Sequence, residues 1–193
     1  MPWEKTFDSD NALTKAMEAF WARGYEATSM QDLVDCTGIG RGSLYATFGD
    51  KHSLFVQALR LYDQRHRADW TERLAELPSG RSAIMAVFDG VIVSALDGGC
   101  RNGCLLMNTA LELSPHDREV GEIVCQCLVH MEHFFCEQLK RAKAANDVPA
   151  DLSPGETAKA LLALLVSLRV FTCARPEPEL LQAISARAEA MIS

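Results

Sequence analysis

A polar stretch between residues 41 and 52 carries side chains suited to contacts with a nucleic acid. The guanidinium fork of Arg41 can bond two acceptors on a guanine edge at once, and the methyl group of Ala46 can touch a thymine methyl. The hydroxyl of Ser43 can bond a base edge in the groove, and Lys51 adds a cation that can contact phosphate. These residue types predict a surface that reads DNA. Its candidate contacts are Arg41, Gly42, Ser43, Tyr45, Ala46, Thr47, Lys51 and His52.

The residues around this surface have the pattern of a helix-turn-helix. Between residues 28 and 54, apolar side chains recur at helical spacing on both sides of Gly38, which can take the left-handed conformation of a sharp turn. Packing of the second helix on the first would leave the polar side chains of the second helix exposed. The residues expected to hold the two helices together are Met30, Leu33, Val34, Ile39, Leu44 and Phe48.

The overall charge does not by itself indicate a nucleic-acid partner. The chain has 193 residues and a formal net charge of −7, and residues 1–60 hold six Lys or Arg against eight Asp or Glu. A helix-turn-helix needs positive potential only on the face that meets phosphate. Arg41, Lys51 and His52 fall close together at that face, so we expect a locally basic edge on an acidic protein.

Proline and glycine residues divide the chain into helical segments with few strand-like alternations. We predict an all-α fold of about nine helices, with a three-helix helix-turn-helix head in residues 1–50 and a C-terminal helical domain in residues 51–193. Expected helices include residues 10–23, ended by Gly24, and residues 51–74, 84–96 and 104–113. The sequences SPHD from Ser114 and SPGE from Ser153 place Ser as a cap and Pro at the first helical position, which predicts two further helix starts.

Two stretches of the chain resemble a known family. The run GIGRGSLYATFGDKHSLF, residues 38–55, is similar to the signature of the TetR family of transcriptional regulators. The run GCLLMNTALEL, residues 103–113, resembles a segment of members that respond to electrophiles and small molecules. The resemblance implies a repressor released from a palindromic operator on double-stranded DNA by a small-molecule effector, and it adds Thr28 to the phosphate contacts. Two heads must lie about 34–36 Å apart to enter successive major grooves, so a homodimer is expected.

The resemblance also assigns roles to the C-terminal helices. Those expected at residues 156–173 and 176–192 are the candidate dimer interface, because they carry more apolar surface than one small domain needs; the alternative is that they complete the core of one chain. The middle helices would enclose an effector pocket, with plain core packing as the alternative for each residue. Arg169, a cation within an apolar helix, needs an anion, either Glu112 or an acidic effector. The pocket candidates are Met85, Phe88, Ile92, Cys104, Met107, Asn108, Leu111, Phe134 and Arg169.

The seven cysteines form no repeating framework, and MPWEKTFDSD lacks a secretory leader, so we expect a cytoplasmic protein. Cys100 and Cys104 flank Arg101, which makes a thiolate sensor of oxidants or electrophiles an alternative to inert, buried cysteine. The His and Cys residues within 125–136 lie partly on one helical face. Nothing elsewhere completes a ligand set, so no metal is expected.

Motifs for catalysis are missing from the sequence. There is no Walker loop, dinucleotide fingerprint or HExxH, so neither an enzyme nor a cofactor is expected. The longest apolar run, residues 160–168, is short for a membrane span. The alternative from another class is a small helical ligand-binding protein or enzyme with an incidental helix-turn-helix.

Overall fold

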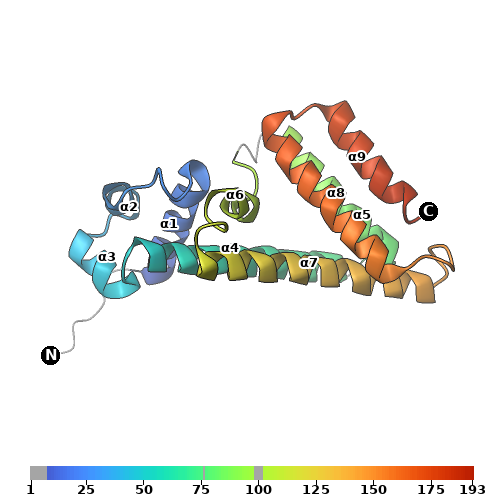
Figure 1. Cartoon of the computed structure of the whole chain (residues 1–193), viewed down its shortest axis with the longest axis horizontal. Coiled ribbons are helices and arrows are strands. Elements are labelled where there is room, and N and C mark those ends of the chain that lie inside the picture. Colours follow the sequence, from blue (N-terminus) through green and yellow to red (C-terminus); the bar gives the residue numbers. More distant parts are fainter. Residues whose placement is uncertain (1–7, 76, 98–101) are drawn as a thin grey trace.

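The computed structural model describes residues 8–75, 77–97 and 102–193, without the side chains of residues 66, 69–73 and 75. The described residues form helices and contain no strand, which confirms the all-α prediction. Figure 1 shows α1, α2 and α3 gathered at one end, α4 and α7 running lengthwise, and α5, α8 and α9 at the other end. The helices are α1 (Ser9–Arg23), α2 (Met30–Thr37), α3 (Arg41–Phe48), α4 (Lys51–Ala75), α5 (Gly80–Leu96), α6 (Leu105–Glu112), α7 (Arg118–Ala144), α8 (Pro154–Ala174) and α9 (Pro178–Ala190).

Local hydrogen bonds explain where the head helices begin and end. Ser29 caps α2 in a capping box, because its side chain accepts the backbone N–H of Asp32 while the Asp32 carboxylate accepts the N–H of Ser29. Gly38 ends α2 with φ 73°, in the left-handed region that favours glycine. Asp50 accepts the backbone N–H of Ser53 at 2.7 Å and caps α4. These boundaries agree with the sequence pattern.

The prediction that Ser114 starts a helix was wrong. Ser114 donates its backbone N–H to the carbonyl of Thr109, and the N–H of Asp117 bonds the carbonyl of Leu113, so the chain turns tightly after α6. Asp117 is the actual cap of α7, accepting the backbone N–H of Val120 at 3.0 Å. A carboxylate three residues later therefore displaced the predicted cap. The second such motif was placed correctly, since α8 begins at Pro154 directly after Ser153.

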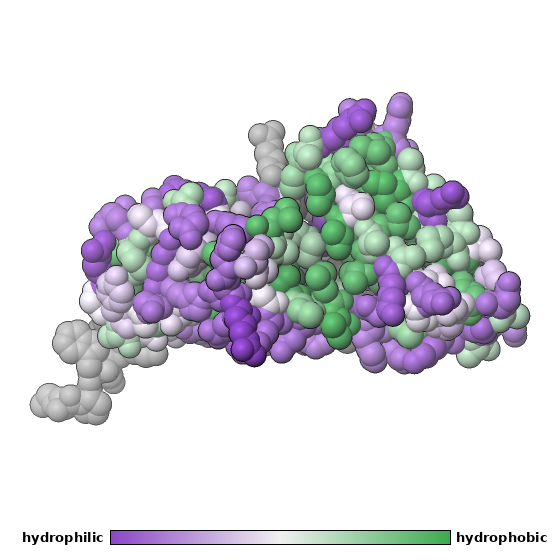
Figure 2. All heavy atoms as spheres, viewed as in Figure 1, coloured by the Kyte–Doolittle hydropathy of each residue, from purple (hydrophilic) through white to green (hydrophobic). Residues whose placement is uncertain are grey.

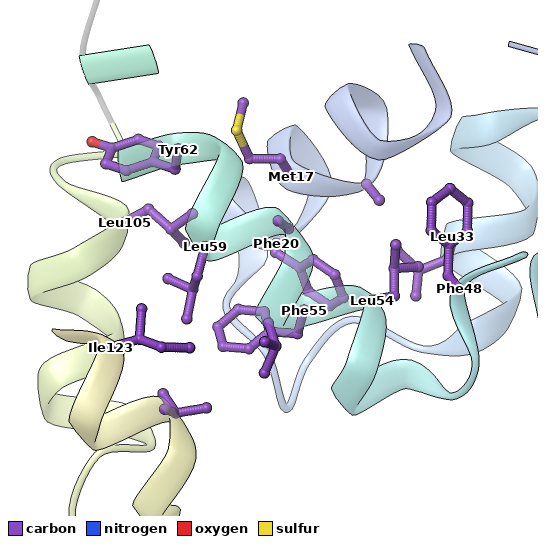
Figure 3. Close-up of a cluster of buried hydrophobic side chains, with 14 of the residues drawn as sticks. Met17, Phe20, Leu33, Phe48, Leu54, Phe55, Leu59, Tyr62, Leu105 and Ile123 are labelled. Carbon is purple, nitrogen blue, oxygen red and sulfur yellow. The ribbon is translucent and has the colours of Figure 1, made fainter. Parts of the chain in front are cut away.

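Two hydrophobic cores hold the helices together. The first joins the head to the start of α4 and to α6 and α7; in it Phe20 and Phe55 meet edge to face with centroids 4.9 Å apart (Figure 3). The second lies among α5, α7, α8 and α9 and includes the fully buried Phe88 and Phe135. Each fully buried side chain of this size contributes about 1.5–3 kcal/mol. The first core contains residues from both sides of residue 50, so the head is packed directly against the remainder of the chain. The predicted division into two domains at residue 50 stays a prediction.

Helix α8 has an unusual composition. By length and composition alone it is long and apolar enough to cross a membrane, contrary to the expectation from the short apolar run at residues 160–168. A third of its most apolar 18-residue stretch is buried within the chain. Core helices of soluble proteins pass the same test. Here α8 packs against α7, α5 and α9.

Candidate nucleic-acid interface and small-molecule pocket

Helix α3 has one apolar face buried in the first core and one polar face exposed to solvent. Leu44 and Phe48 are buried in the first core, at 1% and 6% exposure. Arg41, Gly42, Tyr45 and Ala46 are exposed, and Ser43 and Thr47 are half-buried. The apolar residues thus anchor the helix while the candidate contacts face solvent. Such an arrangement suits insertion of a short helix into a major groove.

The start of α4 is held by two contacts. The ammonium group of Lys51 lies 4.2 Å from the centre of the Tyr25 ring, a cation–π contact that positions the charge beside the head. The imidazole Nε2 of His52 lies 2.7 Å from Oδ2 of Asp117, at the start of α7. Lys51 is therefore available to phosphate, whereas His52 is already engaged with a carboxylate.

Thr28 does not present its side chain to the surface. It is fully buried, and its hydroxyl donates to the carbonyl of Gly24 at 2.6 Å. The hydroxyl is therefore out of reach of phosphate, and the expected contact of Thr28 through a helix start stays a prediction. The physical reason is that Ser29, not Thr28, occupies the capping position, so Thr28 points into the turn that precedes α2.

A cavity of about 270 Å³ lies among α4, α6, α7 and α8. Of the predicted pocket residues, four line it: Cys104, Met107, Phe134 and Arg169. The lining residues that the sequence did not reveal are Tyr62, Asp63, Arg67, Leu106, Cys127, Leu128, His130, Met131, Leu162, Leu165 and Val166. Among them, Asp63 and Arg67 on α4 form an i,i+4 ion pair at 2.8 Å, a spacing that is visible in the sequence.

Five predicted pocket residues lie elsewhere. Phe88 and Ile92 on α5 belong to the second core and Met85 packs against it, away from this cavity. Asn108 is exposed and donates its side-chain N–H to the carbonyl of Asn102 at 2.9 Å. Leu111 is 80% exposed. Helical spacing marks an apolar face, but it cannot say which neighbour covers that face.

Several ionisable groups meet in the pocket. Burial raises the pKa of Tyr62, the nearby Cys104 raises it further, and the positive charge of Arg169 opposes both effects. The Tyr62 hydroxyl donates to the Cys104 sulfur at 3.6 Å. Burial, and then the Asp63 carboxylate, raise the pKa of Cys127 to about 12, so this thiol is protonated at neutral pH.

Glu112 does not pair with Arg169, which corrects the suggestion that it is the partner of this cation. Its two carboxylate oxygens accept the backbone N–H groups of Tyr25 and Glu26, at 3.1 and 2.9 Å. In the part of the chain that the structure describes, no acidic side chain forms an ion pair with Arg169.

The segment from Gly103 to Asp117 connects the pocket to the head. The indole N–H of Trp21 donates to the carbonyl of Gly103 at 3.0 Å, Glu112 holds the turn after α1, and Asp117 holds His52. Leu106 and Met107 of the same segment line the cavity. The segment is therefore joined to the head at Trp21 and at the turn after α1, and to the start of α4 at His52.

The cysteines and histidines do not assemble into a metal site among the described residues, where no group of three or more suitable ligands lies together. Cys127 is buried and Cys125 exposed, on different faces of α7. Cys104 is half-buried at the cap of α6. Cys100 and Arg101, which the thiol-sensor hypothesis also used, lie outside the described residues.

Comparison with known proteins gives matches over both parts of the chain. Residues 12–58 match the family model described as bacterial regulatory proteins, tetR family, and residues 80–184 match the tetracyclin repressor-like C-terminal domain. The chain is 37% identical over 144 residues to the HTH-type regulator YezE of Bacillus subtilis (strain 168), covering 75% of this chain and 74% of the relative. It is 34% identical over 146 residues to the HTH-type transcriptional repressor ComR of Escherichia coli (strain K12), covering 75% and 70%.

A solved structure extends the likeness to the whole chain. A cysteine mutant of the TetR family transcriptional regulator CifR, complexed with 26-base-pair double-stranded operator DNA, matches with a TM-score of 0.86 and 30% identity over 98% of both chains.

Proposed function

We propose that this chain, which belongs to the tetR family of bacterial regulatory proteins and is a DNA-binding transcriptional repressor, binds its operator as a homodimer and is released by a small molecule. Membership of a family of soluble bacterial regulators also supports action in the cytoplasm. The observation that carries the proposal is the polar face of α3, exposed on a helix whose apolar residues are buried in the same core as α1, α2 and α4. In the solved CifR complex, a chain of the same fold is bound to operator DNA.

The proposed DNA contacts follow from this face. Arg41, Ser43 and Tyr45 would reach base edges, and Thr47 and Lys51 would bond phosphates. Gly42 would allow close approach of the backbone, and Ala46 would touch a thymine methyl. His52 would act indirectly, through its contact with Asp117. Thr28 would contribute only through the helix start that follows it, because its hydroxyl is buried.

The proposed dimer would form through α8 and α9. Figure 2 shows apolar side chains gathered over α8, while the surface of the head is largely polar. Half of the leucines and isoleucines of α8 and α9 complete the core of one chain: Leu161, Leu165, Leu168 and Leu181 are buried. The other half are partly exposed, namely Leu162, Leu164, Leu180 and Ile184, and Val170 is 44% exposed. An apolar face of this kind favours association with a second copy.

Release would be a shift between two arrangements of the heads. A ligand that enters the cavity displaces α6, whose Leu106 and Met107 line it, and α6 is joined to the head through Glu112. Heads that are tilted or differently spaced no longer fit successive major grooves, so affinity for the operator falls.

Operator selection from a random duplex pool, followed by titration with Arg41→Ala and Tyr45→Ala, tests the proposal. Each variant should keep its helical circular dichroism and lose about 1–3 kcal/mol of binding free energy for the selected duplex. Arg175→Ala, which removes an exposed arginine beyond α8, is the matched control and should bind as the unmodified protein does. Unchanged binding by both head variants would refute the assigned surface.

Thiol sensing is a second candidate, favoured by the position of Cys104. Its sulfur lines the cavity, accepts the Tyr62 hydroxyl, and sits at the cap of α6, the helix that reaches the head. Oxidation or alkylation of this sulfur would crowd the cavity from within. Cys104→Ser separates the candidates, because it should abolish release by peroxide while it leaves release by a non-covalent effector intact.

A further inference from the structure

We infer that the effector is a small organic anion whose carboxylate binds Arg169. This inference rests on the proposed function, because it names the ligand class of the effector cavity. Arg169 lies in the last third of α8, half-buried, between the apolar residues Leu168 and Val170. Its side chain lines the cavity.

The charges of the described residues leave this cation without an ionic partner. Among the described residues no carboxylate is paired with Arg169. Glu112, the partner that the sequence suggested, instead accepts two backbone N–H groups of the head. The other ionic groups of the lining, Asp63 and Arg67, are joined to each other at 2.8 Å. The lining therefore holds one more cation than anion. A half-buried guanidinium without an anion is unfavourable, and its planar fork matches a carboxylate.

Two polar groups of the lining, those of Tyr62 and Cys104, lie near Arg169. Its charge acts on the Tyr62 hydroxyl, which in turn donates to the Cys104 sulfur at 3.6 Å. The remainder of the lining is mostly apolar and adaptable, with Met107, Met131 and Phe134 among its residues. The arrangement suits an amphipathic ligand, with an anionic head at Arg169 and Tyr62 and an apolar body among the methionines and Phe134.

The volume of the cavity limits the size of this ligand. An apolar cavity of about 150 Å³ accommodates benzene, so a cavity of about 270 Å³ has room for about ten non-hydrogen atoms. A carboxylate takes three of these atoms, which leaves an aromatic ring or a medium aliphatic chain as the body. Long-chain acyl groups and polycyclic compounds exceed this volume.

A paired ligand series tests the inference on the full-length protein. Benzoate, cinnamate, 4-phenylbutanoate and octanoate are each titrated by calorimetry beside the corresponding primary amide, which has the same shape without the charge. At least one carboxylate should bind about tenfold or more tightly than its amide, and Arg169→Gln should remove that preference. Arg118→Gln, which removes an exposed cation from α7, should retain it. If no carboxylate is preferred, or if Arg169→Gln keeps the preference, the inference is wrong.

Two further measurements separate this inference from a structural role of Arg169 and from the proposed function itself. Without ligand, Arg169→Met should melt at the same temperature as the unmodified protein or higher, because it removes a cation without an ionic partner; a fall of several degrees would assign Arg169 to packing and overturn the inference. Arg169→Gln should still bind the selected operator. Operator binding without carboxylate preference contradicts the ligand class alone, whereas absence of operator binding by the unmodified protein contradicts the proposed function.

Discussion

Glu112 and Tyr25 join the pocket helix to the DNA-binding head: Oε2 of Glu112, at the end of α6, accepts the backbone N–H of Tyr25 at 3.1 Å, and Oε1 accepts that of Glu26 at 2.9 Å. The carboxylate also lies against Gly24, where an added Cβ would be 2.9 Å from Oε2. One side chain thus satisfies the turn between α1 and α2 and couples it to the helix that a ligand would displace.

Removal of this carboxylate should weaken both stability and operator binding. We expect Glu112→Ala to lower the free energy of unfolding by about 1–2 kcal/mol, since two hydrogen bonds to a charged acceptor are lost at a partly exposed site, and Glu112→Gln to lose less. Urea denaturation measures the first effect and fluorescence anisotropy on labelled operator the second. Glu119→Ala, an exposed glutamate on α7, is the control. Equal stability of Glu112→Ala and the unmodified protein would show that the contact does not hold the turn.

Lys51 should contribute to DNA affinity through its charge and not through sequence reading. Lys51→Ala should weaken binding to the operator and to an unrelated duplex by the same factor, and should reduce the slope of log affinity against log salt by about one. Tyr25→Leu, which removes the ring 4.2 Å from the ammonium group, should have a smaller effect in the same direction. Anisotropy titrations from low to high salt measure both. Selective loss of operator binding in Lys51→Ala would instead make this residue a base contact.

Acid should destabilise the head through Asp32. Hydrogen bonds from Ser29, and then Arg23, lower the pKa of Asp32 from 3.8 to about 2. Because the folded-state pKa lies below the unfolded value, the contribution of Asp32 is present above about pH 4 and is lost as the pH falls toward 2. Urea denaturation between pH 5 and pH 2 should therefore show a shallower decline for Asp32→Asn than for the unmodified protein. Asp151→Asn, an exposed aspartate before α8, controls for loss of one charge; identical declines for the Asp32 variant and the unmodified protein would rule out this contribution.

Two exposed valines provide a matched test of the dimer. Val170 on α8 is 44% exposed and Val129 on α7 is 56% exposed, so glutamate at either position is tolerated by the folded chain. If α8 and α9 form the interface, Val170→Glu should be monomeric at micromolar concentration in sedimentation experiments and should bind operator far more weakly, whereas Val129→Glu should remain dimeric. The reverse result would move the interface to α7.

Short-range signals predicted the head well. Gly24 and Gly38 end helices where their type and spacing indicated, since caps and turns depend on hydrogen bonds within about four residues. The same logic failed at Ser114, where Asp117 offered a competing cap and the chain bonded back to α6. Propensity at one position does not decide between two caps of similar strength.

The sequence by itself determined the all-α fold, the helix-turn-helix and the family, because a helix-turn-helix is a contiguous motif whose geometry is set by neighbouring residues. Only the tertiary structure decided the cavity and its connection to the head. The lining comes from α4, α6, α7 and α8. The sequence left Glu112 and an acidic effector as alternative partners of Arg169, and the packing places Arg169 in the cavity and Glu112 on the turn after α1. The physical reason is that helical periodicity fixes which side of a helix is apolar, while the neighbours that meet that side, and the space left between them, are fixed only when all the helices pack together.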